Sequence, residues 1–254
     1  KMMKRDGLEV ESQTLWDYVW ALAQALKPAH QRLLEHILCK PVVGADETRW
    51  PLMGDVEGAK RWQAWTIAAP NAVCYRIHDS RSAEAAKKVL KEYSGTVVAD
   101  GYRGYTSLAK ERVGFELAHC WAHVRRKFVE LEEMTPEPAN EYLDLIRQLY
   151  AIEASCPTGP PGDELRAKLR NEQSRKIVGR IREKLTETRA LRESPLGRAS
   201  TYAMSLWGGL VRFLENPKIP IDNNAAERAM RGPVIGRKNH YGSRSKRGTE
   251  VAAL

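Results

Sequence analysis

Apolar residues in the first 40 positions recur at the spacing of an amphipathic helix. Within residues 8–40, Leu15, Val19 and Leu22 lie three or four positions apart, and this period predicts helix. Pro28 interrupts the run, so the pattern predicts two helices with a break between them. We interpret the pair either as an arm that contacts a partner molecule or as a supporting element of the fold.

Between residues 41 and 120 the pattern changes to short apolar runs that are typical of strands. The dipeptide Pro70-Asn71 predicts a tight turn between two of these runs, and glycines at 54–58 predict another. Five strands are predicted, over residues 42–46, 62–69, 72–77, 96–100 and 115–119. Three strands with hairpin-like links therefore come first, and two strands separated by helix follow them.

Two helices are predicted among these strands. One covers residues 82–93, where Ser80 or Ser82 can cap the start and Gly95 ends the helix. A shorter helix near 107–112 follows a glycine-rich loop. This order of elements predicts an α/β sheet of mixed direction, which fits a ribonuclease-H-like core.

From residue 122 to residue 215 the helical period returns. A stretch rich in Pro and Gly at 156–162 breaks it, and we interpret that stretch as a loop rather than a domain linker. The predicted helices cover residues 141–154, 163–192 and 200–214. The predicted organisation is a helical arm at 1–40, a first part of the core at 41–121, an all-helical insertion at 122–215, and a last part of the core, with one further helix, at 216–254.

Three acidic residues lie where this organisation can bring them together. Asp46 ends the first predicted strand, Asp100 ends the fourth, and Glu227 lies on the helix that starts near Asp222. Carboxylate oxygens are the ligands that Mg²⁺ prefers, and two such ions can activate an attacking hydroxyl and stabilise the leaving oxygen of a phosphodiester. We therefore predict that Asp46, Asp100 and Glu227 are the catalytic residues and the ligands of two Mg²⁺ ions, for which Mn²⁺ can substitute.

Each acid also has a purely structural interpretation. Asp46 can simply end a strand, and its neighbour Glu47 is a rival ligand. Asp100 can be a turn residue, and Glu227 can pair with Arg231 one helical turn later. The structural interpretation is adequate for each acid alone, whereas the two aspartates at strand ends together favour a functional site.

The charge balance indicates a polyanionic partner. The 41 Lys and Arg residues exceed the 32 Asp and Glu residues by nine, and clustered basic side chains bind the phosphates of nucleic acid. An ordinary basic excess and a solvated basic tail remain alternatives, and the helical arm at 1–40 becomes a candidate contact to DNA or a second subunit. The predicted DNA-binding residues are Arg125, Arg126, Lys127, Arg228, Arg231, Arg237, Lys238, Arg244 and Lys246.

A second motif runs from His119 to Phe128. Cys120 and His123 have the spacing of half a zinc site, but no second half pairs with them in the sequence. We therefore interpret this segment as packing near the active site. His119, His123 and Asn223 are predicted to support the metal ligands from behind or to contact a phosphate.

The cysteines and the hydropathy pattern bear on the cellular location. Four cysteines are scattered without a disulfide-like rhythm, and the chain has neither a signal peptide nor an apolar run of the roughly 18 residues that cross a membrane. We expect a cytoplasmic, nucleoid-associated protein with no membrane partner. We also expect the chain to be part of a longer protein.

The chain resembles the bacterial insertion-sequence transposases of the family numbered sixty-six. The resemblance is carried by the motifs Gly44-Ala45-Asp46-Glu47-Thr48, Ala99-Asp100-Gly101-Tyr102, Cys120-Trp121-Ala122-His123-Val124-Arg125-Arg126-Lys127-Phe128, Asp222-Asn223-Asn224-Ala225-Ala226-Glu227-Arg228, Pro233-Val234-Ile235-Gly236-Arg237-Lys238-Asn239 and Gly242-Ser243. It implies a DDE transposase with a ribonuclease-H-like core and an insertion before the last acid. It also implies Asp46, Asp100 and Glu227 as the triad.

The same resemblance implies the reaction and the partners. It implies that DNA strands are cut and joined at the ends of an insertion sequence, with two Mg²⁺ ions, by a homodimer on DNA and with accessory proteins of the same element. The N-terminal region that reads the terminal repeats in the family is expected outside this chain. Two other hypotheses remain: a catalytically silent DNA-binding module, and a nuclease of the ribonuclease-H type that cuts without joining.

Overall fold

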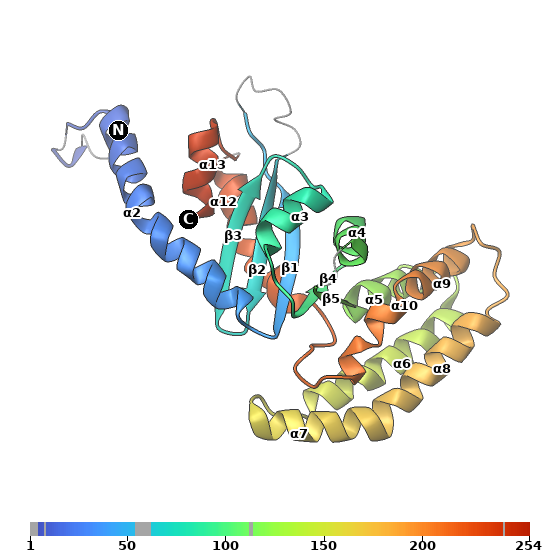
Figure 1. The fold of residues 1–254 in the computed structure, drawn as a ribbon. Helices are drawn as coiled ribbons and strands as arrows, with labels where there is room; N and C mark the ends of the chain where they lie inside the picture. Colours follow the sequence, from blue (N-terminus) through green and yellow to red (C-terminus); the bar gives the residue numbers. More distant parts are fainter. Residues whose placement is uncertain (1–4, 8, 54–61, 112–113, 241) are drawn as a thin grey trace.

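The computed structural model describes residues 5–7, 9–53, 62–111, 114–240 and 242–254. A five-stranded sheet lies at its centre, with helices on both faces (Figure 1). The turn predicted at 54–58 lies outside the described residues. The strands are β1 (Val42–Arg49), β2 (Gln63–Ala69), β3 (Ala72–His78), β4 (Thr96–Ala99) and β5 (Glu116–His119), in the spatial order β3-β2-β1-β4-β5.

The sheet is of mixed direction, as the sequence predicts. The pairs β1–β2 and β2–β3 are antiparallel, whereas β1–β4 and β4–β5 are parallel. The parallel pairing of β1 covers only Val42–Gly44, while its pairing with β2 continues to Arg49. The prediction that Asp46 ends the strand is therefore wrong, because the antiparallel neighbour supports three more residues. Asp46 instead lies just beyond the point where β4 ends.

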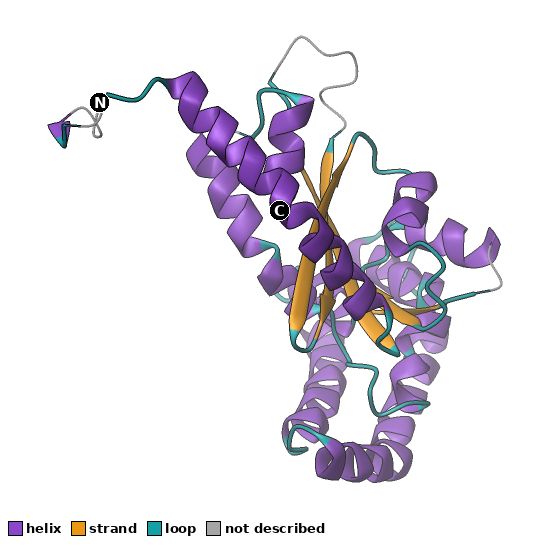
Figure 2. Ribbon diagram, turned by 60° about the vertical axis from the view of Figure 1, so that its left-hand side comes forward, coloured by secondary structure: helices purple, strands orange, loops and turns teal. Residues whose placement is uncertain are grey.

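Alternating strand residues divide the hydrophobic core between the two faces of the sheet. Val97 and Ala99 pack on the face covered by α2 (Ser12–Leu38), α3 (Ala83–Leu90) and α4 (Arg103–Glu111). Val98, between them, packs on the opposite face together with Trp121. On that opposite face α11 (Asn224–Ala229) contacts β1 and β2, and α10 (Trp207–Leu210) contacts β5. The longer helices between β5 and α11 extend beyond the sheet (Figure 2).

Helix α2 runs without a break through Pro28, so the prediction of two helices is wrong. Proline removes one backbone hydrogen bond from a helix, and Pro28 lies on the exposed side, where water can solvate the freed carbonyl. Leu34 and Ile37, after the proline, are buried against the sheet, whereas Tyr18 and Leu22, before it, are 68% and 60% exposed. The second half of α2 therefore packs on the sheet, whereas its first half, in which Ala23 is buried, extends away from the sheet (Figure 1).

The ends of the next two helices differ from the predictions. Ser82 caps α3, because its side chain accepts a hydrogen bond from the Ala85 amide at 3.2 Å. The helix ends at Leu90 rather than at Gly95, since Lys91 adopts a left-handed backbone with φ of 49°. Helix α4 begins at Arg103, within the predicted loop, and the carboxylate of Asp100 accepts a hydrogen bond from the Tyr102 amide just before it.

The helices between β5 and α11 form one unit that we call the helical group. It comprises α5 (Trp121–Val129), α6 (Pro136–Ala154), α7 (Pro160–Leu169), a π-helical turn (Arg170–Ser174), α8 (Arg175–Glu187), α9 (Pro195–Ser205), α10 (Trp207–Leu210) and a 3₁₀ turn (Arg212–Leu214). The single helix predicted over 163–192 is instead interrupted by the π turn and ends at Glu187. The helical character of the region is confirmed, and its apolar stripes form a continuous core.

Arg170, at the π turn, fastens the helical group to the segment that leads to α11. Its side chain is 1% exposed and makes a two-pronged ion pair with Glu153, with Nε–Oε1 and Nη2–Oε2 distances of 2.7 Å. The same guanidinium donates to the carbonyl oxygens of Phe213, Asn216 and Ile219. A buried charge needs all of its donors satisfied, so the path of residues 213–219 is fixed by this one side chain.

The C-terminal helices α12 (Arg231–His240) and α13 (Lys246–Ala253) return to the other edge of the sheet (Figure 1). Trp50 Nε1 donates to Ser243 Oγ at 3.0 Å, which holds the chain between α12 and α13 against the end of β1. Lys27 of α2 pairs with Glu250 of α13 at 2.8 Å. Over the described residues, none of these helices is both long enough and apolar enough to cross a membrane.

Candidate active site

Asp46 lies on β1 on the side that faces α11, because it alternates with Ala45, which is buried in the opposite core. Its pKa is raised from 3.8 to about 7, first by burial and next by the charge of Glu47. A hydrogen bond from the Glu47 amide at 2.9 Å opposes the shift, and the charges of Asp100 and Glu227 add to it. Asp46 is therefore within electrostatic range of both other predicted acids.

Asp100 directly follows β4, as predicted. Its carboxylate is fixed by the Tyr102 amide at 2.9 Å, and its carbonyl oxygen lies 3.2 Å from His119 Nδ1. His119 comes from the end of β5 and packs so tightly on Gly209 that a Cβ there would lie 2.4 Å from the ring. The turn after β4 is thus held by the neighbouring strand and by the helical group.

Glu227 is carried by α11, whose approach to β1 is unusually close. A Cβ on Gly44 would lie 2.7 Å from Asn223 Oδ1 and 3.1 Å from the Cβ of Ala226. Asn223 also donates from Nδ2 to the Ala45 carbonyl at 2.8 Å. The glycine two residues before Asp46 is therefore what allows the helix of Glu227 to lie against the strand of Asp46.

The start of α11 is fixed by Asp222, whose carboxylate accepts from the Asn224 amide at 3.0 Å and from the Asn224 side chain. The end of the helix is fixed by Tyr75, which donates to the carbonyl of Ala229 at 2.8 Å. Both ends of this short helix are thus held by contacts that do not involve Glu227.

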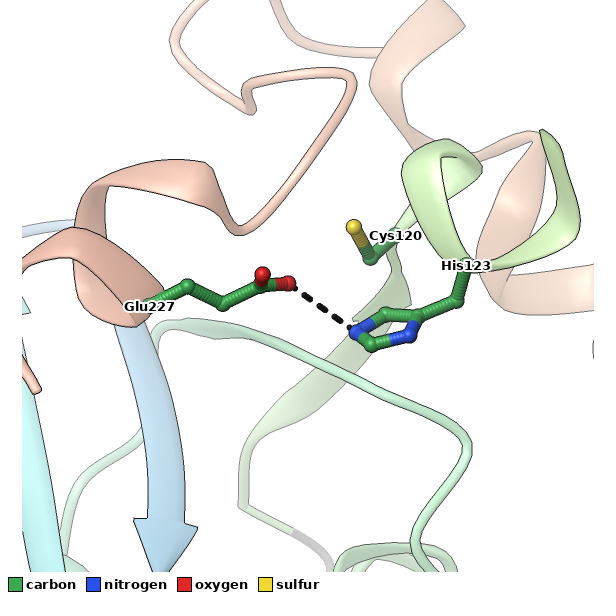
Figure 3. Close-up of side chains that lie close together, drawn as sticks. All are labelled: Cys120, His123 and Glu227. Carbon is green, nitrogen blue, oxygen red and sulfur yellow. Dashed lines mark ion pairs between the residues drawn. The ribbon is translucent and has the colours of Figure 1, made fainter. Parts of the chain in front are cut away.

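The carboxylate of Glu227 points toward α5. Its Oε1 lies 3.0 Å from His123 Nε2, and its Oε2 lies 3.9 Å from Arg126 (Figure 3). The alternative partner Arg231 forms no ion pair with it in the described part of the chain. Oε1 is buried, and apart from this contact with His123 it accepts no hydrogen bond from the described residues. This oxygen is suited to accept a cation.

A cleft of about 300 Å³ opens beside these groups. Asp46 and Glu227 line it from the strand and the helix, and His123 lines it from the helical group. The remaining lining residues are Glu47, Thr48, Met230, Arg231 and Val234, with Asp100 outside this set. Two of the three predicted acids therefore share a cleft, while the third acts on Asp46 through its charge.

Glu47, the rival ligand, pairs with Arg81 through one of its two oxygens. Its Oε1 accepts two hydrogen bonds from Arg81, at 2.8 Å and 2.6 Å, and its side chain is only 2% exposed. Arg81 in turn stacks on the ring of Tyr102, with 4.0 Å between the guanidinium carbon and the ring centre. Burial raises the pKa of Glu47, and the Arg81 bond opposes this shift. Its Oε2 is buried without a hydrogen-bond partner among the described residues, so Glu47 remains a rival ligand at the cleft.

These groups fit divalent cations by their own chemistry. Burial and the charges of the neighbouring acids disfavour the ionised form of Asp46 and raise its pKa. Adding positive charge between them reverses that penalty. The unsatisfied Glu227 Oε1 is a further acceptor in the same cleft.

The three predicted supporting residues each contact a predicted acid or its neighbour. His119 contacts the Asp100 carbonyl, His123 contacts the Glu227 carboxylate, and Asn223 holds the carbonyl next to Asp46. The pKa of His119 is lowered, and burial is the largest cause. His119 is therefore neutral at pH 7, and its predicted role is to orient the backbone of Asp100. Their functional roles remain predictions.

The predicted DNA-binding residues do not all have free side chains. Arg237 donates to Thr48 Oγ1 at 3.2 Å and to the Arg49 carbonyl, so it holds α12 to the end of β1. Lys127 pairs with Glu130 at 2.9 Å, and Arg126 approaches Glu227. The other six are exposed: Arg125, Arg228, Arg231, Lys238, Arg244 and Lys246.

Sequence reasoning missed two features of the site. The Arg81–Glu47 pair with its Tyr102 stack gave no signal, because its members are far apart in the sequence. The proximity of Cys120 and Glu227 was missed for the same reason, although the Cys120–His123 spacing was a visible clue.

Comparison with known proteins assigns this α/β chain to a class. The sequence matches the transposase IS66 family over residues 1–251, so the chain belongs to that family. The uncharacterized protein y4jD of Sinorhizobium fredii (strain NBRC 101917 / NGR234) is 32% identical over 268 aligned positions, which cover 98% of this chain and 52% of that protein.

Two more proteins of the same strain are similar. The uncharacterized protein y4qI is 32% identical, over 92% of this chain and 47% of its own length. The uncharacterized protein y4hP is 28% identical, over 99% of this chain and 50% of its own length. The chain thus spans about half the length of the curated relatives it matches.

Proposed function

We propose that this chain is the catalytic part of a DDE transposase that cuts and joins DNA strands at the ends of an insertion sequence. The observation that carries the proposal is the raised pKa of Asp46, to which the charges of Asp100 and Glu227 both contribute. Structural acids on a surface repel one another little, whereas perturbed acids in a cleft are typical of functional sites. Membership of the transposase family supports the same proposal.

Asp46, Asp100 and Glu227 are proposed to hold two Mg²⁺ ions, and Mn²⁺ can substitute. When bound, these ions activate the attacking hydroxyl and stabilise the leaving oxygen. The residues of the chain do the rest: Asp46 gives up its proton, Asn223 and Gly44 hold α11 against β1, and His119 orients the turn of Asp100. His123 holds Glu227 Oε1 in place from the helical group.

The strand order supports a finer description of the fold. Three antiparallel strands followed by two parallel strands, with acids on the first and fourth, are the arrangement expected of a ribonuclease-H-like core. We propose that the helical group is an insertion into this core between β5 and α11. It brings His123 to the cleft, which Arg231 lines from α12, and the exposed Arg125, Arg228 and Arg231 are proposed to contact bound DNA.

The test is Mg²⁺-dependent cleavage and joining of DNA that carries the ends of the element. Asp46→Asn, Asp100→Asn and Glu227→Gln are each expected to lower the rate by about 1,000-fold or more, because a metal ligand is lost. Asp144→Asn is the matched control, since Asp144 is exposed on α6 and pairs only with Arg147 among the described residues. Full activity in one of the three variants would remove that residue from the set of ligands.

The same assay separates the competing functions. DNA binding without cleavage by the unmodified protein would favour a silent DNA-binding module. Cleavage without strand joining would favour a nuclease of the ribonuclease-H type. Sedimentation of the protein–DNA complex tests the proposed homodimer, and addition of accessory proteins of the same element tests whether they are required.

A further inference from the structure

Cys120, His123 and Glu227 form a cluster of a different chemical type from the acidic site. One ligand atom from each residue lies within 4.8 Å of the other two, and Figure 3 shows the three side chains converging. Two of them come from the start of α5 and the third from α11. The cluster therefore bridges the helical group and the helix of Glu227.

The spacing within this cluster matches the geometry of a tetrahedral metal site. With metal–ligand lengths of about 2.0–2.3 Å, the ligand atoms of a zinc site lie roughly 3.5 Å apart. The His123–Glu227 contact, at 3.0 Å, is already closer than that, and the group as a whole spans at most 4.8 Å. Small rotations of the side chains are sufficient to surround an ion. The Cys-x-x-His spacing is also the local half of known zinc sites.

Backbone amides approach the sulfur of Cys120. Cys120 Sγ accepts from the Asn223 amide at 3.2 Å, and the amides of Ala122 and His123 also lower the pKa of the thiol. Backbone donors of this kind orient metal ligands and stabilise their charge. Burial nevertheless raises the pKa of Cys120 to about 11 in the metal-free protein. Metal binding therefore displaces the thiol proton, which leaves to solvent.

We propose that Cys120, His123 and Glu227 form a binding site for a soft divalent cation, Zn²⁺. A thiolate and an imidazole select zinc over magnesium, which prefers oxygen ligands and keeps its waters. Three protein ligands leave a fourth position for water. Because Zn²⁺ uses the carboxylate of Glu227, its binding withdraws that residue from the acidic site. This inhibitory consequence rests on the proposed function, whereas the binding itself does not.

Co²⁺ is the spectroscopic probe for the site. The metal-free protein titrated with Co²⁺ is expected to show the near-ultraviolet absorption of a cobalt–thiolate bond, which an equivalent of Zn²⁺ then abolishes. Cys120→Ser keeps an acceptor for the Asn223 amide and is expected to lose this absorption. Cys156→Ser is the matched control, because Cys156 is also buried but lies just after α6, where its thiol donates to the Ile152 carbonyl. Equal absorption in Cys120→Ser and parent, or none in the parent, would overturn the proposal.

A second measurement needs no variant. In mild urea, where transient opening of the protein exposes the buried thiol, Zn²⁺ is expected to slow alkylation of Cys120, as read by peptide mass spectrometry, while the exposed Cys39 reacts equally with and without the ion. Equal rates of Cys120 alkylation with and without saturating Zn²⁺ under these conditions would contradict the site even if the variant failed to fold.

The inhibitory consequence is tested on DNA cleavage. At fixed Mg²⁺, Zn²⁺ is expected to inhibit the parent and Cys156→Ser at lower concentration than Cys120→Ser, each compared with its own zinc-free rate. Equal sensitivity of all three proteins would refute the inhibition. If no Mg²⁺-dependent cleavage occurs in any protein, the proposed function fails, and the cobalt and alkylation results still decide the zinc site.

Discussion

Two regions of the molecule bury their apolar side chains in different ways. One region is the sheet together with α2, α3 and α4, and the other is the helical group. Around the sheet, one apolar cluster packs side chains that alternate along strands, such as Val43 and Ala45. In the helical group, a second cluster packs helix stripes around Trp121, and a buried ion pair of Arg170 with Glu153 lies at its edge. Packing around the sheet depends on the alternation of residues along each strand. Packing in the helical group depends also on Arg170, a single charged side chain that joins segments far apart in the sequence.

This difference matters for the candidate site because the two regions contribute different parts of it. Asp46 and Asp100 lie on neighbouring strands whose positions follow from sheet pairing. Glu227 reaches them only after the chain has passed through the helical group, and His123 of that group contacts it. We therefore expect changes in the helical group to act on Glu227, and changes in the sheet to act on Asp46.

The largest expected effect comes from Arg170→Met. It leaves three carbonyl oxygens without this donor and leaves the Glu153 carboxylate with Arg166 alone, at 3.3 Å, and breaking a buried ion pair on one side costs about 3–5 kcal/mol. Urea unfolding measures the loss. Arg147→Met is the control, since Arg147 has a side chain that is 75% exposed. A loss as small as that of the control would show that Arg170 does not fasten the helical group.

Gly44→Ala tests the contact between the two regions from the side of the sheet. The new Cβ would lie 2.7 Å from Asn223 Oδ1, so α11 must shift, at an expected cost of about 2–3 kcal/mol. Thermal unfolding and Mg²⁺ titration are expected to show lower stability and weaker binding together. Gly179→Ala on α8 meets no atom within 4 Å and is expected to stabilise the protein by about 0.5–1 kcal/mol. Weak Mg²⁺ binding in Gly179→Ala as well would show that the contact between α11 and Gly44 is not the cause of the effect.

Asp46→Asn is expected to stabilise the metal-free protein while it abolishes activity. Because the folded pKa of Asp46 is about 7 and its usual value is 3.8, the folded state loses stability as pH rises from about 4 to about 7. The side-chain amide introduced by Asp46→Asn does not ionise, so the variant avoids this loss of stability. We expect a difference of about 1–2 kcal/mol above pH 7, reduced from the full effect of the pKa shift because solvent and counter-ions screen the charge.

Urea unfolding at pH 4 and pH 8, without metal, checks this prediction. Parent and Asp46→Asn are expected to differ at pH 8 and to agree at pH 4. The same shift implies that Mg²⁺ binding releases a proton and weakens below pH 7 in the parent. A stability difference that does not depend on pH would mean that Asp46 is not the group that titrates.

The smallest effect is expected from the exposed basic residues. Arg231→Gln, at the cleft, is expected to weaken DNA binding by about 0.5–1 kcal/mol and to reduce the slope of log affinity against log salt by about 1. Arg147→Gln, on the helical group, is the control with no change in slope. Identical slopes for both variants would place the DNA path away from Arg231.

The residues explain which parts of the fold could be predicted from the sequence. Strand positions and mixed direction follow from short apolar runs and from Pro70-Asn71, which act over a few neighbours. The continuation of β1 to Arg49 depends on pairing with β2, and helix through Pro28 depends on packing of Leu34 and Ile37 on the sheet. Tertiary contacts decide both, and no local pattern records them.

The candidate site shows the same division. Asp46, Asp100 and Glu227 stood out by their motifs, and the structure couples Asp46 electrostatically to the other two. The sequence did not indicate that Arg81 pairs with Glu47, that Arg237 is held by β1, or that Cys120 lies close to Glu227. In each case the partner lies far along the chain and is brought near only by the complete fold.

The contacts of Arg170 with the three carbonyl groups of residues 213–219 have a consequence for when the proposed ligands come together. During synthesis, Asp46 and Asp100 leave the ribosome long before Glu227, and these two alone are an incomplete set of the proposed carboxylates. We expect Glu227 to join them once Arg170 has bound the segment that leads to α11. On the proposed function, a nascent or half-unfolded chain is therefore expected not to cut DNA.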